Sequence, residues 1–310
     1  MTDAAIAEVL ARVDPDRLAA DLHYLCADPL PRRTVNFTRP GADRCSLYEA
    51  DDFLTARLTD LGYTVERQGV PVQAFRCDPS KPKAHQYAPP APEDPWHEAF
   101  NLSVRRPGRR CPQRTLVALG HKDSQSWVAS PGAYDNGVGT VAVLELARIL
   151  AEAPLDHSLW LLWCNEEHTP WTSVAAAQAA AERGEDLAAI FNLDSLGGRS
   201  ESVVWAGRRT AVTVYTCDQG RPFAELIGQV VADFGLDLEA SVVRAEFAND
   251  DDGMFIKAGY PHAVKILGSF PYAHRWYHDE RDTADGVDIS NVALSTQAVL
   301  AALLRLDAAD

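Results

Sequence analysis

Apolar and polar positions follow two different periods along the chain, and each period predicts one type of element. In the N-terminal part, apolar residues recur at helical spacing over 47–61, and Gly62 follows them, which predicts a helix with a C-terminal stop. The next residues, 63–70, have the composition of a strand. Residues 78–98 are rich in proline and contain charged and histidine side chains, which predicts a long surface loop or insertion.

From residue 113 onward, short apolar runs alternate with longer amphipathic stretches. The runs predict strands at 115–120, 158–164, 187–193 and 262–267, and the longer stretches predict helices at 136–151 and 289–306. Such alternation is typical of a mixed, largely parallel sheet with helices on both faces. We therefore expect one α/β domain over 1–310, with 78–98 as a loop insertion.

Composition and charge exclude several classes of protein. The hydrophobic content of 46% suffices for a buried core, and a net charge of −15 without a long basic run argues against nucleic acid as a partner. No stretch approaches the roughly 20 apolar residues of a membrane span. The first twenty residues lack the pattern of a secretory signal. These features predict a cytoplasmic protein without a membrane partner.

The six cysteines lie far apart and form no CxxC pair, so neither a zinc ribbon nor a redox motif is indicated. Reduced thiols are the default state in the cytosol. A disulfide among Cys45, Cys77 and Cys111, which flank the irregular N-terminal third, stays an open alternative.

Ionisable residues follow the ends of the predicted strands, and one further aspartate, Asp135, stands where the helix at 136–151 begins. Taken one by one, each has an ordinary explanation: an aspartate at a helix start is usually a cap, and two adjacent glutamates usually begin a solvated loop. Together, two histidines and several carboxylates at one edge of a sheet provide the ligands that zinc prefers. The residues at these positions are His121, Asp123, Asp135, Glu166, Glu167, Asp194, His278 and Asp282.

Six ordered motifs carry a resemblance to a known family. They are GHKDS, PGAYDNGVG, NEEHTPWTS, NLDSLGG, NDDDGMF and YHDERDT. In this order and at these intervals they resemble the site motifs of the di-zinc aminopeptidase family of peptidase clan MH, which includes bacterial leucyl aminopeptidases and plasma glutamate carboxypeptidase. The resemblance covers roughly residues 113–306, and 47–70 is similar to the opening of the family's fold.

The resemblance implies two Zn²⁺ ions and a division of work between the adjacent glutamates. One ion would be bound by His121, Asp135 and Asp194, and the other by Asp135, Glu167 and His278. Asp123 would orient His121, and Glu166 would act as the general base. Neighbouring side chains at a strand end point in different directions, which is consistent with separate roles for Glu166 and Glu167. The resemblance also implies a cis peptide bond between Asp135 and Asn136.

The chain departs from the family's usual pattern at a few positions. Thr169 and Pro170 stand where glycines commonly follow the paired glutamates, Tyr134 precedes Asp135 where a second acidic residue is common, and Asp252 stands where histidine is frequent. None of these changes removes an expected ligand. They affect the expected substrate preference more than the chemistry, and Tyr134, Trp171, Trp276 and Tyr277 can serve either as packing or as pocket walls.

The leading hypothesis is a zinc-dependent aminopeptidase that hydrolyses the N-terminal bond of a peptide or a small amide. One alternative is a transferase resembling glutaminyl cyclases, which share the fold and use one zinc ion. Another is a carboxypeptidase or amidohydrolase, in which Arg33, Arg39 or Lys122 would bind a substrate carboxylate. A binding module that has lost catalysis is the alternative of a different class, and its usual sign, the loss of ligands, is not seen here.

Overall fold

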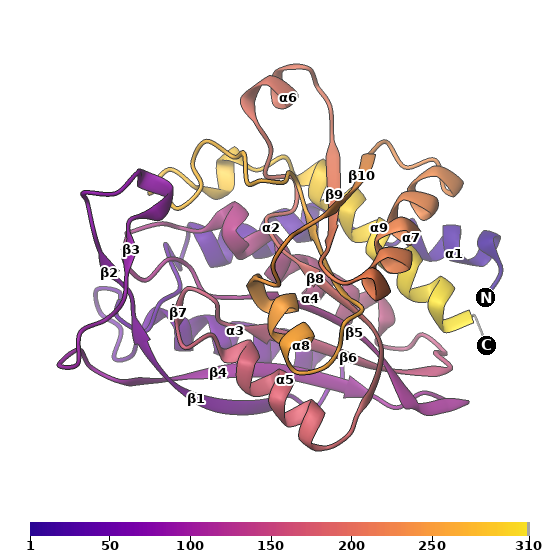
Figure 1. Ribbon diagram of the computed structural model, residues 1–310, viewed down its shortest axis with the longest axis horizontal. Helices are drawn as coiled ribbons and strands as arrows, with labels where there is room; N and C mark the ends of the chain where they lie inside the picture. Colours follow the sequence, from indigo (N-terminus) through magenta and orange to yellow (C-terminus); the bar gives the residue numbers. More distant parts are fainter. Residues whose placement is uncertain (309–310) are drawn as a thin grey trace.

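A nine-stranded mixed sheet runs through the molecule in the computed structural model, which describes residues 1–308 (Figure 1). The central neighbours β11, β8, β5 and β6 are parallel, whereas β4, β1 and β7 form an antiparallel edge and β9 is antiparallel to β11. In sheet order the strands are β10 (Glu239–Arg244), β9 (Thr210–Tyr215), β11 (Ala263–Leu267), β8 (Asp186–Leu193), β5 (Cys111–His121), β6 (His157–Cys164), β4 (His97–Arg106), β1 (Glu66–Ala74) and β7 (His168–Thr169).

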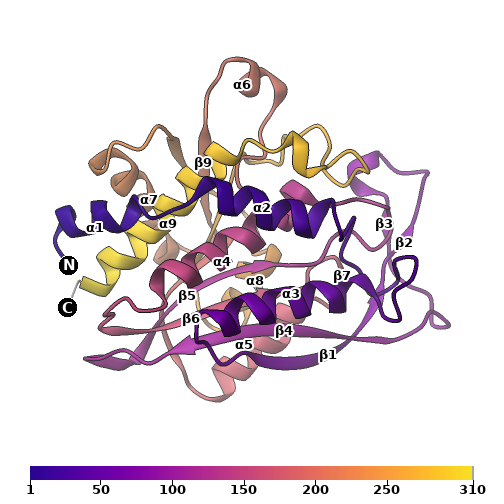
Figure 2. The same cartoon turned by 180° about the vertical axis from the view of Figure 1, so that it is seen from behind.

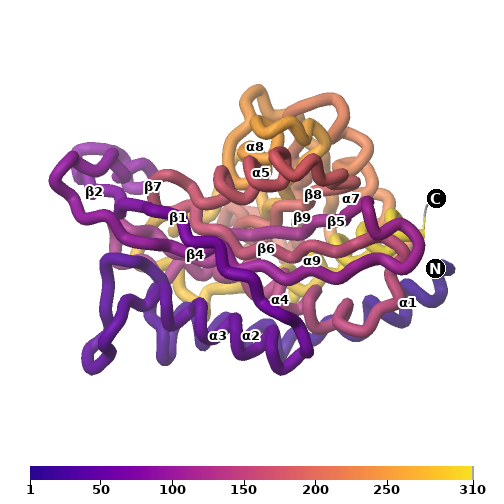
Figure 3. Tube along the Cα trace, turned by 90° about the horizontal axis from the view of Figure 1, so that it is seen from below, coloured from indigo at the N-terminus to yellow at the C-terminus, as the bar shows by residue number. Residues whose placement is uncertain are grey.

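Helices cover both faces of this sheet. Helices α5 and α8 lie on one face, and α2, α3, α4 and α9 lie on the other (Figures 2 and 3). The prediction of a largely parallel α/β sheet between two helical layers is therefore confirmed. The helices are α1 (Asp3–Leu10), α2 (Pro15–Cys26), α3 (Ser46–Asp60), α4 (Val138–Leu150), α5 (Thr172–Glu182), α6 (Glu201–Trp205), α7 (Arg221–Asp233), α8 (Asp250–Lys257) and α9 (Ile289–Ala308).

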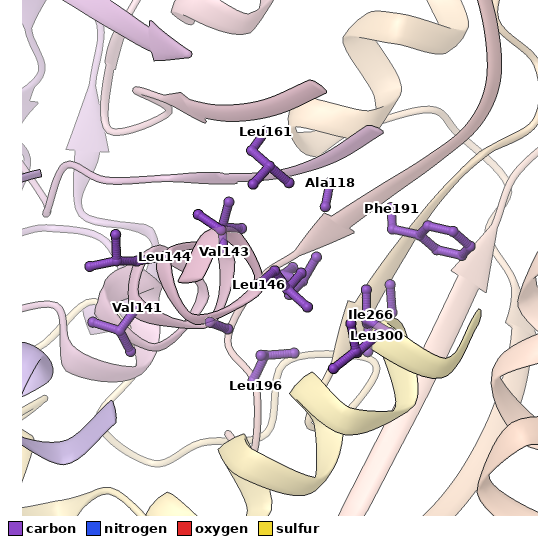
Figure 4. Packing of buried hydrophobic residues seen from close by; sticks show 14 of the residues in the cluster. Ala118, Val141, Val143, Leu144, Leu146, Leu161, Phe191, Leu196, Ile266 and Leu300 are labelled. Carbon is purple, nitrogen blue, oxygen red and sulfur yellow. The ribbon is translucent and has the colours of Figure 1, made fainter. Parts of the chain in front are cut away.

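The main core lies between α4 and the central strands. Figure 4 shows Val143 and Leu146 of α4 beside Ala118, Leu161 and Phe191 of β5, β6 and β8, and all five side chains are fully buried. Full burial of an aliphatic or aromatic side chain stabilises a fold by about 1.5–3 kcal/mol. This packing fixes α4 against the central strands of the sheet.

Helix α9 is the one described helix that is long and apolar enough to cross a membrane by length and composition. In the structure, 67% of its most apolar window is buried, and the helix packs against α4 and α7. This burial is typical of a core helix.

The structure corrects the predicted limits of two segments in the N-terminal third. The strand expected at 63–70 begins at Glu66 and continues to Ala74, where it pairs with β4 and β7. The loop expected at 78–98 ends two residues earlier, because residues 97 and 98 already belong to β4 and pair with β1.

The proline-rich segment also contains short regular pieces. These are a 3-10 turn, η1 (Lys83–His85), and the two-residue strand β3 (Tyr87–Ala88), which pairs with β2 (Arg76–Cys77).

All six cysteines are free in the structure.

Candidate metal centre

The ends of three parallel strands supply most of the candidate site. β5 ends at His121, β6 is followed by Glu166 and Glu167, and β8 is followed by Asp194. Because β5 is parallel to both β6 and β8, these strands place their carboxyl ends at the same edge of the sheet. The structure thus brings together residues that lie up to 73 positions apart, from His121 to Asp194.

Two further predicted residues reach the same place from turns. Asp135 lies in the buried irregular turn at Ala133–Gly137, directly before α4, and His278 lies in the loop after β11. The peptide bond between Asp135 and Asn136 is cis, as predicted. The carboxylate of Asp282 accepts hydrogen bonds from the backbone N–H groups of Tyr134, at 2.9 Å, and of Asp135, at 3.1 Å, and so holds this turn.

The five residues form two groups that share Asp135. In the His121 group (His121, Asp135 and Asp194), Nε2 of His121 lies 3.1 Å from Oδ1 of Asp135 and 3.6 Å from Oδ1 of Asp194. In the His278 group (Asp135, Glu167 and His278), Nε2 of His278 lies 3.1 Å from Oδ2 of Asp135 and 3.5 Å from Oε1 of Glu167. Asp135 therefore directs one oxygen toward each group, the geometry that a bridging carboxylate needs.

The hydrogen bond of the His278 ring suits metal binding. Nδ1 of His278 lies 2.7 Å from the carbonyl oxygen of Ala84 and must donate to it, because a carbonyl oxygen only accepts. In the neutral ring, Nε2 then presents a lone pair to carboxylate oxygens, and a cation between them would attract every donor atom. Zinc takes this combination of imidazole and carboxylate donors. The residues of both groups therefore fit the metal that the sequence predicts.

Nearby carboxylates favour the protonated form of His121 and His278 in the metal-free chain. Burial opposes the charged form of His278, but the charge of Glu167 and hydrogen bonds with Asp135 and Glu167 raise its pKa to about 10. Burial likewise opposes the charge on His121, while Asp123, Asp135 and Asp194 hold its pKa well above the ordinary value. The site thus stabilises positive charge strongly.

Asp123 organises the site from behind. Its oxygens accept hydrogen bonds from the backbone N–H groups of Glu166 at 2.9 Å and Glu167 at 2.8 Å, and lie 3.1 Å from Nδ1 of His121 and 2.7 Å from Nδ1 of His168. Although burial favours the neutral acid, these two histidines hold the pKa of Asp123 far below its usual range. Asp123 thus contacts the ring of His121, which the resemblance expects it to orient, and it also holds the backbone N–H groups of both glutamates.

Sequence reasoning missed two neighbours of the groups. The buried amide of Gln125 donates from Nε2 to Oδ2 of Asp135, at 3.0 Å, and to Oε1 of Glu167, at 2.8 Å, so it spans the two carboxylates of the His278 group. The ring of His168 lies between Asp123 and the backbone N–H of Val35, which donates to its Nε2 at 3.3 Å. His168 stands in the NEEH motif itself, which was the only signal for it.

Glu166 belongs to neither group, although it lines the same pocket. Its Oε2 accepts a hydrogen bond from the backbone N–H of Asp251 at 3.1 Å. Burial, together with the charges of Asp250 and Asp251, raises the pKa of Glu166 well above its ordinary value. A carboxylate with a raised pKa beside two candidate metal-binding groups is suited to accept and return a proton.

The pocket over the two groups has a volume of about 140 Å³. Aromatic side chains form much of its wall, and Phe75, Tyr87 and Trp127 contact one another there. Trp171 and Tyr277 also line it, which assigns both to the pocket wall. A larger cavity, of about 410 Å³, is lined by Tyr134, Trp276 and four arginines and holds neither group. We place the chemistry in the smaller pocket because residues of both groups line it.

At the start of α8, beyond Glu166, three aspartates are buried (Asp250, Asp251 and Asp252), and Lys265 pairs with the first of them. Asp252 is 2% exposed, and burial raises its pKa to about 7, although Lys265 opposes the shift. The folded chain therefore binds a proton here that the unfolded chain releases near pH 4, so this group's contribution to stability is complete below pH 4 and is lost as the pH rises to about 7.

Replacing Asp252 by asparagine should remove this loss of stability at higher pH. Asp252→Asn keeps the oxygen that accepts from Nδ2 of Asn192 at 3.4 Å, and its new amide can donate to Oδ1 of Asn192, which has no partner among the described residues. We expect the metal-free variant to be more stable than the wild type at pH 8 by on the order of 1–3 kcal/mol, and equal to it near pH 4. Urea unfolding across this range measures the difference, with the exposed Asp285→Asn as control. Equal stabilities at pH 8 would contradict the prediction.

Comparison with known proteins identifies the family. Residues 101–303, well over half of the chain, match peptidase family M28. The chain belongs to peptidase family M28. Leucine aminopeptidase 1 of Blastomyces gilchristii is 27% identical over 230 residues, a match that covers 70% of this chain and 58% of that protein. The chain thus spans less than two thirds of the length of this relative.

Solved structures with the same fold cover most of the chain. The LapA aminopeptidase of Legionella pneumophila superposes with a TM-score of 0.72 at 15% identity, covering 100% of this chain and 76% of that one. A glutaminyl cyclase of Fimbriiglobus ruber superposes with a TM-score of 0.67 at 17% identity, covering 94% of this chain and 95% of that one. The M28 fold of this chain is therefore similar to that of both kinds of enzyme.

Proposed function

We propose that the chain is a zinc-dependent aminopeptidase that hydrolyses the N-terminal bond of peptides, with two zinc ions and with Glu166 as the general base. The observation that supports this most is the pair of histidine and carboxylate groups joined by Asp135, with Glu166 beside them and outside both. Membership of peptidase family M28 and the leucine aminopeptidase relative support the same reading.

The residues would have two separate roles, metal binding and proton transfer. His121, Asp135 and Asp194 would hold one ion, and Asp135, Glu167 and His278 the other. Bound zinc lowers the pKa of water to about 7 and polarises a carbonyl group. Glu166 would take the proton from the attacking water and return it to the leaving amine, which requires that its lone pairs remain free of metal.

The charge of the pocket favours a substrate with a free amine. Five carboxylates line it, and none of its lining residues is lysine or arginine. Because Glu166 belongs to neither metal-ligand group, its carboxylate would stay free to accept a hydrogen bond from a substrate amine. The carboxylates are those of Asp135, Glu166, Glu167, Asp194 and Asp250.

The same observation counts against the carboxypeptidase alternative. The buried guanidinium of Arg33 donates to main-chain carbonyl groups, Lys122 pairs with Asp51 at 2.8 Å, and Arg39 pairs with Glu49. None of the three lines the pocket, so none is placed to bind a substrate carboxylate.

A glutaminyl cyclase is the second candidate function, because an enzyme of that name has the same fold. A cyclase releases ammonia from an N-terminal glutamine without net hydrolysis of the peptide. The presence of both groups favours the aminopeptidase, since a cyclase of the expected type needs only one zinc ion.

A substrate panel separates these functions. We expect the zinc-loaded chain to release p-nitroaniline from aminoacyl-p-nitroanilides with an apolar side chain, and to leave N-acetylated analogues intact because they lack the cationic amine. Cyclised product from a glutaminyl peptide, measured by mass spectrometry, without hydrolysis of any nitroanilide would overturn the aminopeptidase in favour of the cyclase. Glu166→Gln, assayed in parallel, shows whether any observed activity comes from this site.

A further inference from the structure

The two oxygens of Asp194 face different partners. Oδ1 lies in the His121 group, 3.6 Å from Nε2 of His121. Oδ2 accepts a hydrogen bond from the hydroxyl of Tyr272 at 2.7 Å. The hydroxyl of Tyr272 thus binds one carboxylate oxygen while the other lies nearest His121, and this bond restricts rotation of the carboxylate.

A buried ion pair favours this choice of acceptor. The hydroxyl of Tyr272 also lies 2.9 Å from Oδ2 of Asp250, but it has a single proton to donate. Lys265 of β11 pairs with that same oxygen of Asp250, and both side chains are at least nine-tenths buried. Because Lys265 already neutralises Asp250, Asp194 is the carboxylate with the greater demand for the hydroxyl proton.

Stacked rings fix the position of the hydroxyl. The ring of Tyr272 stacks on that of Tyr277, with centroids 4.7 Å apart and planes 7° from parallel. Tyr277 in turn stacks on His278, with centroids 3.8 Å apart. Tyr272 is therefore held between the Lys265 and Asp250 pair on one side and the ring of Tyr277 on the other.

We propose that Tyr272 is a positioning residue that fixes Asp194 with one oxygen facing the His121 group and thereby raises the zinc affinity of that group. This inference rests on the proposed zinc-dependent function. Groups that hydrogen-bond to metal ligands contribute about 10–100-fold to metal affinity. If Tyr272 were only a wall of the substrate pocket, its hydroxyl would affect KM and leave zinc binding unchanged.

The matched variants are Tyr272→Phe and Tyr277→Phe. The first removes only the hydroxyl and keeps the stacked ring. The second removes a hydroxyl from the neighbouring ring of the same stack. Zinc is titrated into metal-free protein by calorimetry, and zinc-edge anomalous scattering from crystals at limiting zinc shows which group is occupied.

We expect Tyr272→Phe to lose about 10–100-fold in affinity at the His121 group and to keep the wild-type affinity at the His278 group. Tyr277→Phe should bind both ions as the wild type does. Unchanged affinities in Tyr272→Phe, or an equal loss at both groups, would overturn the inference while the proposed function stands. A wild-type chain that binds no zinc would contradict the proposed function itself, and the inference with it.

Discussion

Glu166→Gln should lower kcat by about 10²–10⁴ while leaving both zinc ions bound, the usual effect of removing a positioned base. Glutamine keeps the size of the side chain and the oxygen that accepts from the Asp251 N–H, but it has no basic lone pair to take up a proton. Because Glu166 belongs to neither metal-ligand group, its neutralisation removes no ligand. Steady-state kinetics and zinc content, measured on the same preparation, test both parts of this expectation.

Glu167→Gln is the matched control for this prediction. It makes the same chemical change one residue away, in a carboxylate whose Oε1 lies 3.5 Å from Nε2 of His278. We expect Glu167→Gln to lose zinc from the His278 group, whereas Glu166→Gln keeps it. If both glutamates were ordinary solvent-exposed loop residues, both variants would keep near-normal activity and zinc content. A fully active Glu166→Gln variant would show that Glu166 is not the general base.

Asp135→Ala should abolish activity because it weakens zinc binding. We expect turnover to fall by at least the roughly 10²–10⁴ that we expect for Glu166→Gln. Asp135 is the one residue shared by both groups, and each of its oxygens lies 3.1 Å from the Nε2 of a different histidine. Alanine keeps the backbone N–H that donates to Asp282, so the turn retains that support. Zinc titration by calorimetry should show weakened binding at both groups.

The exposed Asp285→Ala provides the control for loss of a carboxylate, since it lies outside both groups and should retain two zinc ions. Circular dichroism of the two variants distinguishes loss of metal from loss of fold. Two equivalents of zinc bound to Asp135→Ala with wild-type affinity would show that this residue does not bridge the ions.

The sequence predicted which strand ends form the site, because the apolar runs mark the strands and a parallel arrangement brings their carboxyl ends together. His121, Glu167 and Asp194 follow buried apolar runs, and in a parallel sheet such ends meet at one edge. Asp135 and His278 lie in turns without periodicity, so their positions at a helix start and in a loop indicated them only as candidates, and the ordered motifs assigned them to the expected groups. Their proximity in the structure agrees with the predicted groups, and their roles as ligands stay predictions.

The surroundings of the site could not be read from the sequence. Gln125, Tyr272 and the Ala84 carbonyl each act through contacts between segments far apart in the chain, and a polar residue in an irregular loop has no pattern that marks it. The proline-rich segment illustrates this: its composition predicted a loop, but not that its backbone would accept a hydrogen bond from His278. The expected cytoplasmic location rests on composition and stays a prediction.

Anomalous diffraction at the zinc edge, from crystals of the zinc-loaded chain, tests the central claim most directly. We expect two peaks about 3.5–4 Å apart, the separation typical of two-metal hydrolytic sites. One peak should lie among His121, Asp135 and Asp194, the other among Asp135, Glu167 and His278, with the Glu166 carboxylate outside the coordination of both. A single peak, or a peak coordinated by Glu166, would contradict the account.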